Sequence, residues 1–259
     1  MTYDVTMPGP TIAFSTLGCP EWDVATVVER AADLGYDAIE WRGGPDGHVR
    51  TSWGAGERHA LRDLMSNAGL TALAVTAYCP DVTAEVALAT DLGAPFVRAF
   101  LTEPVEASIA AFQASAVHAR ELGVRIAVEP HDDFVRADTV GPILAAVDRP
   151  EVGVVWDPAN AWAAGDAPEH GMAVLGDRIC YVQLKDGVGH GDSWRLTRLG
   201  EGEVPLSRVI ELLAARGPMP PLSLEWERAW HPELDPAEIA LGPALATIRS
   251  LVEAVPAVR

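Results

Sequence analysis

The 259-residue chain is 49% hydrophobic and carries a formal charge of -18, a composition typical of a soluble globular protein. Its acidity argues against a nucleic-acid partner, because proteins that bind polyphosphate normally need a basic surface to displace counterions. No apolar run approaches the roughly 20 residues of a membrane-spanning helix, so we also expect no membrane partner.

Residues 1–11 contain neither a lysine or arginine nor an apolar core, and we therefore expect no signal peptide. Three cysteines, Cys19, Cys79 and Cys180, are odd in number and far apart, which predicts reduced thiols and a cytoplasmic location. Because no linker or low-complexity tract divides the sequence, we expect a single domain over residues 1–259.

The first half of the chain repeats one order of elements: a helix, a glycine and a strand. After a first strand at residues 12–16, Asp23 is expected to cap a helix that ends at Gly35 before a strand at 37–41. The same order recurs before strands near residues 71, 96 and 125, with Gly69, Gly93 and Gly123 at the joints. The spacing of these glycines is that of βα units.

Further strands are expected near residues 153, 180 and 222. The last helix has a clear start, with Asp235 as N-cap and Pro236 at the first helical position. Eight strands alternating with helices predict an α/β fold of the (β/α)8 TIM-barrel type. A doubly wound open sheet is the alternative, but its glycine-rich fingerprint is missing after the first strand, where residues 17–21 read LGCPE.

Four predicted strands end in oxygen-bearing side chains. These are Glu129, Asp157, Gln183 and Glu225. Strand residues face inward and outward in turn, and the positions of opposite parity to these four are uniformly apolar, as a helix-covered outer face requires. We therefore expect the four oxygen-bearing side chains to point into the barrel at its C-terminal end.

Several carboxylates in one lumen would repel each other and lose hydration unless a cation neutralised them. We therefore predict a divalent metal site with Glu129, Asp157, Gln183 and Glu225 as ligands. Oxygen-only ligation suits Mn²⁺ or Mg²⁺ better than Zn²⁺, and we favour Mn²⁺. Taken singly, each acid has a simpler explanation as a loop residue or a cap, such as Asp157 before Pro158.

The ordered set of motifs resembles the xylose-isomerase-like TIM-barrel superfamily, the sugar phosphate isomerase/epimerase group. The resemblance covers nearly the whole chain and rests on five segments, STLGCP at 15–20, VEPH at 128–131, WDPAN at 156–160, VQLKD at 182–186 and LEW at 224–226. It implies that Glu129, Asp157, Gln183 and Glu225 are the metal ligands, with Glu129 and Glu225 doubling as catalytic acid/base residues.

Two positions depart from the pattern of that superfamily. Gln183 stands where the superfamily commonly has a histidine, and a glutamine at this position resembles the pattern of some dehydratase members. Asn160 stands three residues after the second ligand, where the superfamily often has a histidine. Endonuclease IV chemistry, which needs a histidine-rich zinc cluster, is more remote. We assign His131, Lys185 and Asn160 as candidate substrate-binding residues; a surface histidine and a lysine bridging two acids are the alternatives.

The expected chemistry is proton abstraction next to a carbonyl through a metal-stabilised enediolate. Three functions remain open: an isomerase or epimerase of a sugar, keto-sugar or inosose; a lyase acting on a keto-cyclitol, a dehydroshikimate-like acid or an oxidised glycoside; and a non-catalytic carbohydrate-binding barrel. The expected partner is a small carbohydrate or cyclitol, and a homo-oligomer is left open. Residues 187–204 are expected to form a lid.

Overall fold

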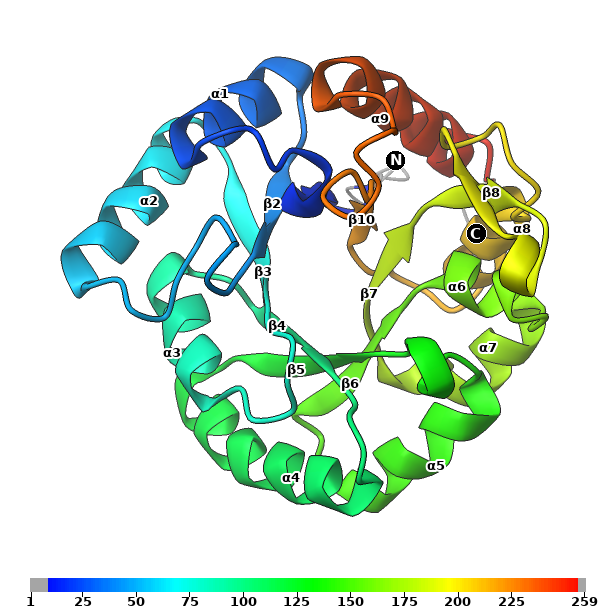
Figure 1. Ribbon diagram of the computed structural model, residues 1–259, viewed down its shortest axis with the longest axis horizontal. Helices are drawn as coiled ribbons and strands as arrows, with labels where there is room; N and C mark the ends of the chain where they lie inside the picture. Colours follow the sequence, from blue (N-terminus) through cyan, green and yellow to red (C-terminus); the bar gives the residue numbers. More distant parts are fainter. Residues whose placement is uncertain (1–8, 256–259) are drawn as a thin grey trace, which may run out of the picture.

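Eight parallel strands close into a barrel in the computed structural model, which describes residues 9–255 (Figure 1). The strands are β1 (Ile12–Ser15), β2 (Ala38–Arg42), β3 (Thr71–Thr76), β4 (Phe96–Phe100), β5 (Arg125–Glu129), β6 (Val152–Trp156), β7 (Ile179–Leu184) and β10 (Leu222–Leu224). The barrel closes where β10 pairs with β1, with Ile12 opposite Leu222 and Phe14 opposite Leu224. All eight predicted strands and the (β/α)8 fold are confirmed.

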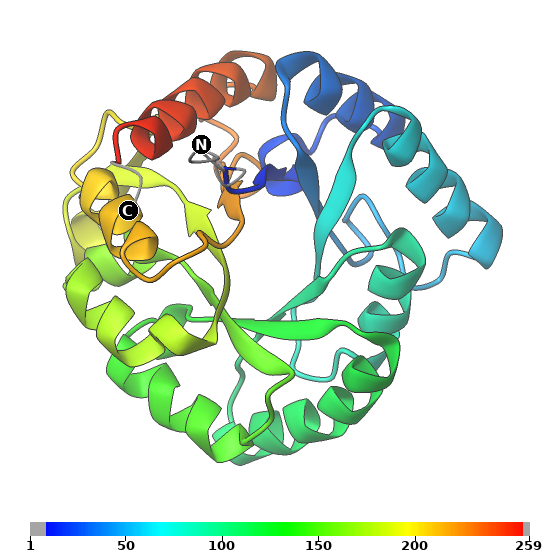
Figure 2. The same cartoon turned by 180° about the vertical axis from the view of Figure 1, so that it is seen from behind.

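Helices surround the barrel on all sides, as both views show (Figures 1 and 2). They are α1 (Val24–Leu34), α2 (Ala55–Asn67), α3 (Thr83–Leu92), α4 (Val105–Leu122), α5 (Ala137–Val147), α6 (Pro158–Ala163), α7 (Pro168–Leu175), α8 (Leu206–Ala214) and α9 (Ala237–Glu253). Within residues 9–255, no helix combines the length and hydropathy that crossing a membrane would need. Residues 1–8 and 256–259 of the expected domain, including most of the segment where we expected no signal peptide, lie outside the described residues.

The expected caps of α1 are present. The Asp23 carboxylate accepts a hydrogen bond from the Thr26 N–H, and Gly35 ends the helix with a φ of 88°, a left-handed conformation that glycine adopts without steric cost. The expected start of α9 was wrong by one residue: Pro236 is the N-cap, and the Asp235 carboxylate instead pairs with Arg198 at 2.7 Å. The arginine competes for the side-chain oxygens that would otherwise bind the helix amides.

Two separate apolar cores confirm the predicted alternation of side chains. Val128, Val154 and Val182 belong to the larger core, which lies between strands and helices. Ala127 and Tyr181 belong to a smaller core on the opposite strand face, inside the barrel. Because the interior core is small, the polar side chains at the C-terminal ends of the strands rest on a short apolar floor.

Residues 187–204 form a pinned hairpin segment instead of a free lid. Strands β8 (Asp186–Val188) and β9 (Arg195–Thr197) pair antiparallel beside the barrel. The Asp186 carboxylate accepts hydrogen bonds from the backbone N–H groups of Gly187, Gly200, Gly202 and Val204 at 2.9–3.1 Å. Four donors on one buried carboxylate hold both ends of the segment together.

Candidate active site

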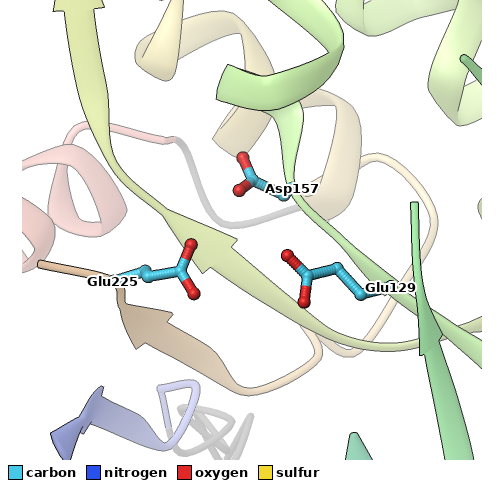
Figure 3. A group of neighbouring side chains, drawn as sticks. All are labelled: Glu129, Asp157 and Glu225. Atoms are coloured by element: carbon cyan, nitrogen blue, oxygen red, sulfur yellow. The ribbon is translucent and has the colours of Figure 1, made fainter. Parts of the chain in front are cut away.

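The three predicted carboxylate ligands meet at the C-terminal end of the barrel. Glu129 is the last residue of β5, and Asp157 and Glu225 directly follow β6 and β10. One oxygen of each carboxylate lies within 4.8 Å of the others, and Figure 3 shows the three groups turned toward one another. Each residue is at most 2% exposed. The sequence analysis was therefore correct in predicting that these three acids, far apart along the chain, lie close together.

Gln183 lies on the strand between two of these acids, since β7 pairs with β6 on one side and β10 on the other. Its amide nitrogen donates to Glu225 Oε1 at 3.1 Å and to Glu40 Oε1 at 3.1 Å. Its amide oxygen is buried without a hydrogen-bond partner. An oxygen left in this way is a ready ligand atom for a hard cation.

Two cationic side chains neutralise part of the acidic cluster. Arg98, on β4, pairs with Glu129, with Glu225 at 2.8 Å and with Glu40 at 3.2 Å. The sequence analysis did not predict that one guanidinium would join three acids. Residue parity alone gives the direction of a side chain and not its partner across the barrel.

Lys185 is the only lysine of the chain, and it is buried in the site. Its ammonium lies 3.0 Å from Asp157 Oδ2 and 2.8 Å from Glu225 Oε2, and it also pairs with Glu227. This is the alternative interpretation that we gave for Lys185, a lysine that bridges acids. Because the Lys185 ammonium already pairs with three acids, a contact between Lys185 and a substrate stays a prediction.

The surrounding charges separate the pKa values of the two proposed acid/base residues. Burial raises the pKa of Glu129 to about 7, although Arg98 opposes the shift. Burial also acts on Glu225, but the charges of Arg98 and Lys185 outweigh it and lower the pKa of that carboxyl to about 2. Burial raises the pKa of Asp157 against the effect of Lys185. With protein charges alone, Glu129 is the carboxylate best suited to exchange a proton near neutral pH.

The residues of the site fit a divalent cation. Glu129 Oε1 and Gln183 Oε1 are buried acceptors without a hydrogen-bond partner. Asp157 Oδ2 has no hydrogen bond of good geometry, although the Lys185 ammonium lies 3.0 Å away. Arg98 and Lys185 are shared by five carboxylates, Glu40, Glu129, Asp157, Glu225 and Glu227, and Glu227 also lies 3.7 Å from His231 Nε2. A further positive charge would offset this excess.

A cavity of about 320 Å³ lies beside Glu225 and is also lined by Arg98 and His131, but not by Glu129 or Asp157. The His131 ring packs edge-on against Phe100, and its Nδ1 lies 3.0 Å from Asp132 Oδ2. His131 is therefore placed where a bound molecule could reach it.

Two other candidate substrate-binding residues, Lys185 and Asn160, do not line this cavity. Asn160 lies on α6, where its backbone N–H donates to Asp157 Oδ1 at 3.0 Å. Its side-chain nitrogen is buried without a hydrogen-bond partner. The structure thus brings His131 to the cavity and gives Asn160 and Lys185 contacts with the acids.

An aromatic wall completes the cavity. Tyr78 and Phe100 stack with ring centroids 5.4 Å apart, and Trp230 meets Tyr78 edge-on. The Arg42 guanidinium lies 4.6 Å from the centre of the Trp230 ring. Trp230 is the only tryptophan among the residues that line this cavity.

The fold and the acidic centre define a (β/α)8 barrel with a candidate metal site at the C-terminal ends of its strands. The chain belongs to the family described as xylose isomerase-like TIM barrel, whose model matches residues 28–250. The resemblance inferred from the sequence motifs is thereby confirmed. No curated protein sequence matches the chain significantly.

Solved structures with the same fold cover the whole barrel. The IOLI protein, solved with a zinc atom, is 20% identical with a TM-score of 0.79, and the match covers 96% of this chain and 100% of that one. D-psicose 3-epimerase of Clostridium cellulolyticum H10, solved with D-tagatose, is 14% identical with a TM-score of 0.75 over 93% and 99%. The probable 3-DHS dehydratase AsbF of Bacillus anthracis is 14% identical with a TM-score of 0.73 over 92% and 98%. These identities show a shared fold.

Proposed function

We propose that the chain is a divalent-metal-dependent isomerase or epimerase that acts on a sugar, keto-sugar or inosose by removing a proton next to a carbonyl. The observation that carries this proposal is the convergence of Glu129, Asp157 and Glu225 within 4.8 Å, with the unpartnered amide oxygen of Gln183 on the strand between two of them. The epimerase and the zinc-containing protein of the same fold support it by analogy.

We infer that Glu129, Asp157, Gln183 and Glu225 would hold the ion, and we favour Mn²⁺ because all four donors are oxygens. A bound divalent ion would act as a Lewis acid that polarises the substrate carbonyl and stabilises the enediolate. Arg98 and Lys185 balance the remaining negative charge and fix the carboxylates in place.

In this proposal Glu129 accepts the proton from the carbon next to the carbonyl. Its Oε1 is buried without a hydrogen-bond partner, and a bound divalent ion would lower the pKa of Glu129 and keep the carboxylate ionised. In an epimerisation, Glu225 in its protonated form would donate a proton to the opposite face of the enediolate and become ionised, while Glu129 keeps the abstracted proton until it exchanges with solvent. Return of the proton to the neighbouring carbon gives an isomerisation. His131 is suited to orient a substrate hydroxyl, since its ring lines the cavity with Glu225.

A lyase of the same family is the second candidate. Loss of a leaving group β to the carbonyl follows the same first step, and the dehydratase of the same fold supports this outcome by analogy. Gln183 favours it as well, since a glutamine there resembles some dehydratase members. A non-catalytic carbohydrate-binding barrel is the third candidate.

Three free cysteines support our proposal of a cytoplasmic location.

Solvent exchange tests the proposal. The purified chain with Mn²⁺ is incubated with candidate ketoses and inososes in deuterated water, and the substrate is followed by NMR. Deuterium at the α-carbon without loss of water or an aglycone supports the isomerase or epimerase, and exchange with elimination supports the lyase. Glu129→Gln should abolish the exchange. Retained turnover in that variant would reject Glu129 as the base.

A further inference from the structure

Glu40 is the anchor of a hydrogen-bond network inside the barrel, below the acidic cluster. The side chain is fully buried on β2. Its Oε1 accepts from Tyr181 Oη at 3.0 Å, from Gln183 Nε2 at 3.1 Å and from Arg98 Nη1 at 3.2 Å. Its Oε2 accepts from Ser223 Oγ at 2.6 Å. Four donors from three other strands, β4, β7 and β10, therefore hold this carboxylate in one position.

The hydrogen bonds to Glu40 and Glu225 fix the orientation of the Gln183 side-chain amide. The amide nitrogen donates both to Glu40 and to Glu225, and an ionised carboxylate can only accept hydrogen bonds. A half-turn of the amide would place its oxygen about 3 Å from two negatively charged groups, where it would be repelled. The amide nitrogen is therefore fixed toward Glu40, and the oxygen is left free on the other side.

We propose that Glu40 is a positioning residue that holds the Gln183 carbonyl oxygen in the orientation needed to bind the metal ion. The inference rests on the proposed function, because it assumes that Gln183 is a ligand. Groups that hydrogen-bond to metal ligands set the orientation of those ligands, and removing one typically lowers metal affinity roughly 10- to 100-fold.

Glu40 itself is poorly placed to be a ligand. Both of its oxygens already accept hydrogen bonds, and it is not among the acids that converge in one ion-sized group. Glu129 Oε1 and Gln183 Oε1, in contrast, have no hydrogen-bond partner. Glu40 is therefore assigned as a positioning residue, whereas Glu129 and Gln183 are assigned as ligands.

The test is a double-mutant cycle read out as Mn²⁺ affinity. Free Mn²⁺ is titrated by electron paramagnetic resonance against the full chain, Glu40→Met, which offers Gln183 no acceptor, Gln183→Ala and the double variant. We expect each single substitution to weaken Mn²⁺ binding by roughly 10- to 100-fold. If Glu40 acts through Gln183, the double variant should bind no more than about threefold more weakly than Gln183→Ala alone.

Tyr181→Phe is the matched control, since it removes one donor to Glu40 and leaves the bond to Gln183; we expect its affinity to stay within about threefold of the parent chain. Full affinity in Glu40→Met, or equal losses that add in the double variant, would overturn the positioning role while the metal site stands. An unsubstituted chain that does not bind Mn²⁺ would overturn the proposed function as well. Circular dichroism checks folding, and if Glu40→Met does not fold, Glu40→Asp replaces it, because the shorter acid keeps the charge but withdraws from Gln183.

Discussion

Nη1 of Arg98 lies 2.8 Å from Oε1 of Glu225, inside a barrel where both side chains are almost completely buried. The same guanidinium also contacts Glu40 and Glu129. A strand in the first half of the chain therefore supplies the charge that stabilises acids of the second half. The Arg98 guanidinium therefore holds these acids in place without a bound substrate.

Replacing Arg98 with methionine should leave three buried carboxylates without their shared partner. Breaking a buried ion pair costs about 3–5 kcal/mol, and we expect a loss of this size in the free energy of unfolding in EDTA. Mn²⁺ should restore more stability to the variant than to the parent chain, because it supplies the missing positive charge. Urea unfolding with and without Mn²⁺ measures both effects.

Arg208→Met is the control for that comparison, because Arg208 also pairs with two acids, Glu169 and Glu211, but on the exposed surface. Screening by solvent makes such pairs weak, so this variant should lose far less stability and show no response to Mn²⁺ beyond that of the parent chain. Equal losses in the two variants would contradict the role of Arg98.

The raised pKa of Glu129 predicts a pH dependence of stability in EDTA. The folded chain holds this proton more tightly than the unfolded chain, whose glutamate has an ordinary pKa of 4.5. The stabilisation is therefore complete below pH 4.5 and is lost as the pH rises through about 7. At about 1.4 kcal/mol per pKa unit, the shift corresponds to about 3.5 kcal/mol at most.

Glu129→Gln removes this titration while keeping the shape of the side chain. The difference in unfolding free energy between the parent and this variant should therefore fall between pH 5 and pH 8. Denaturant unfolding at several pH values provides the measurement, and parallel curves for the two proteins would refute the assignment.

Gln183→His should shift the metal preference of the site toward Zn²⁺. An imidazole nitrogen is a better ligand for zinc than an amide oxygen, and we expect the Zn²⁺/Mn²⁺ affinity ratio to rise by about tenfold or more. Competition between the two ions, measured by mass spectrometry of the bound metal, checks this. Gln113→His, at the only other glutamine of the chain, should leave the ratio unchanged. An unchanged ratio in Gln183→His would count against Gln183 as a ligand.

Asp186→Asn should loosen the hairpin segment without unfolding the barrel. The amide turns one acceptor oxygen into a donor that faces two backbone N–H groups, and bonds to a charged acceptor are worth about 1.5–3 kcal/mol each. Amide hydrogen exchange at Gly200, Gly202 and Val204 should accelerate at least about tenfold. Asp192→Asn, at an exposed acid of the same segment, is the control. Unchanged exchange at the three amides would contradict the pinning role of Asp186.

Local signals in the sequence were enough to predict the barrel and its acidic centre. Strand parity placed Glu129, Asp157 and Glu225 inside, because the alternation of side chains is a property of each strand alone. Contacts across the lumen could not be predicted in this way. The four donors on Glu40 come from three other strands, and only the closed barrel brings them together.

The errors have a similar cause. The hairpin of residues 187–204 was interpreted as a lid because its two strands are only three residues long and carry little periodic signal. Its order comes from the Asp186 carboxylate, which accepts from amides up to 18 residues away. The start of α9 was misjudged because Arg198, remote in sequence, takes the side chain of Asp235. Long-range partners overrode local preference in both places.

Closure of the barrel by β10 against β1 also has a consequence for biosynthesis. Glu225 follows the last strand, so a nascent chain on the ribosome can align Glu129 and Asp157 well before the third acid has emerged from the exit tunnel. The pairing joins opposite ends of the polypeptide, which is a slow, entropically costly step. The proposed metal site would therefore be completed only after β10 has paired with β1.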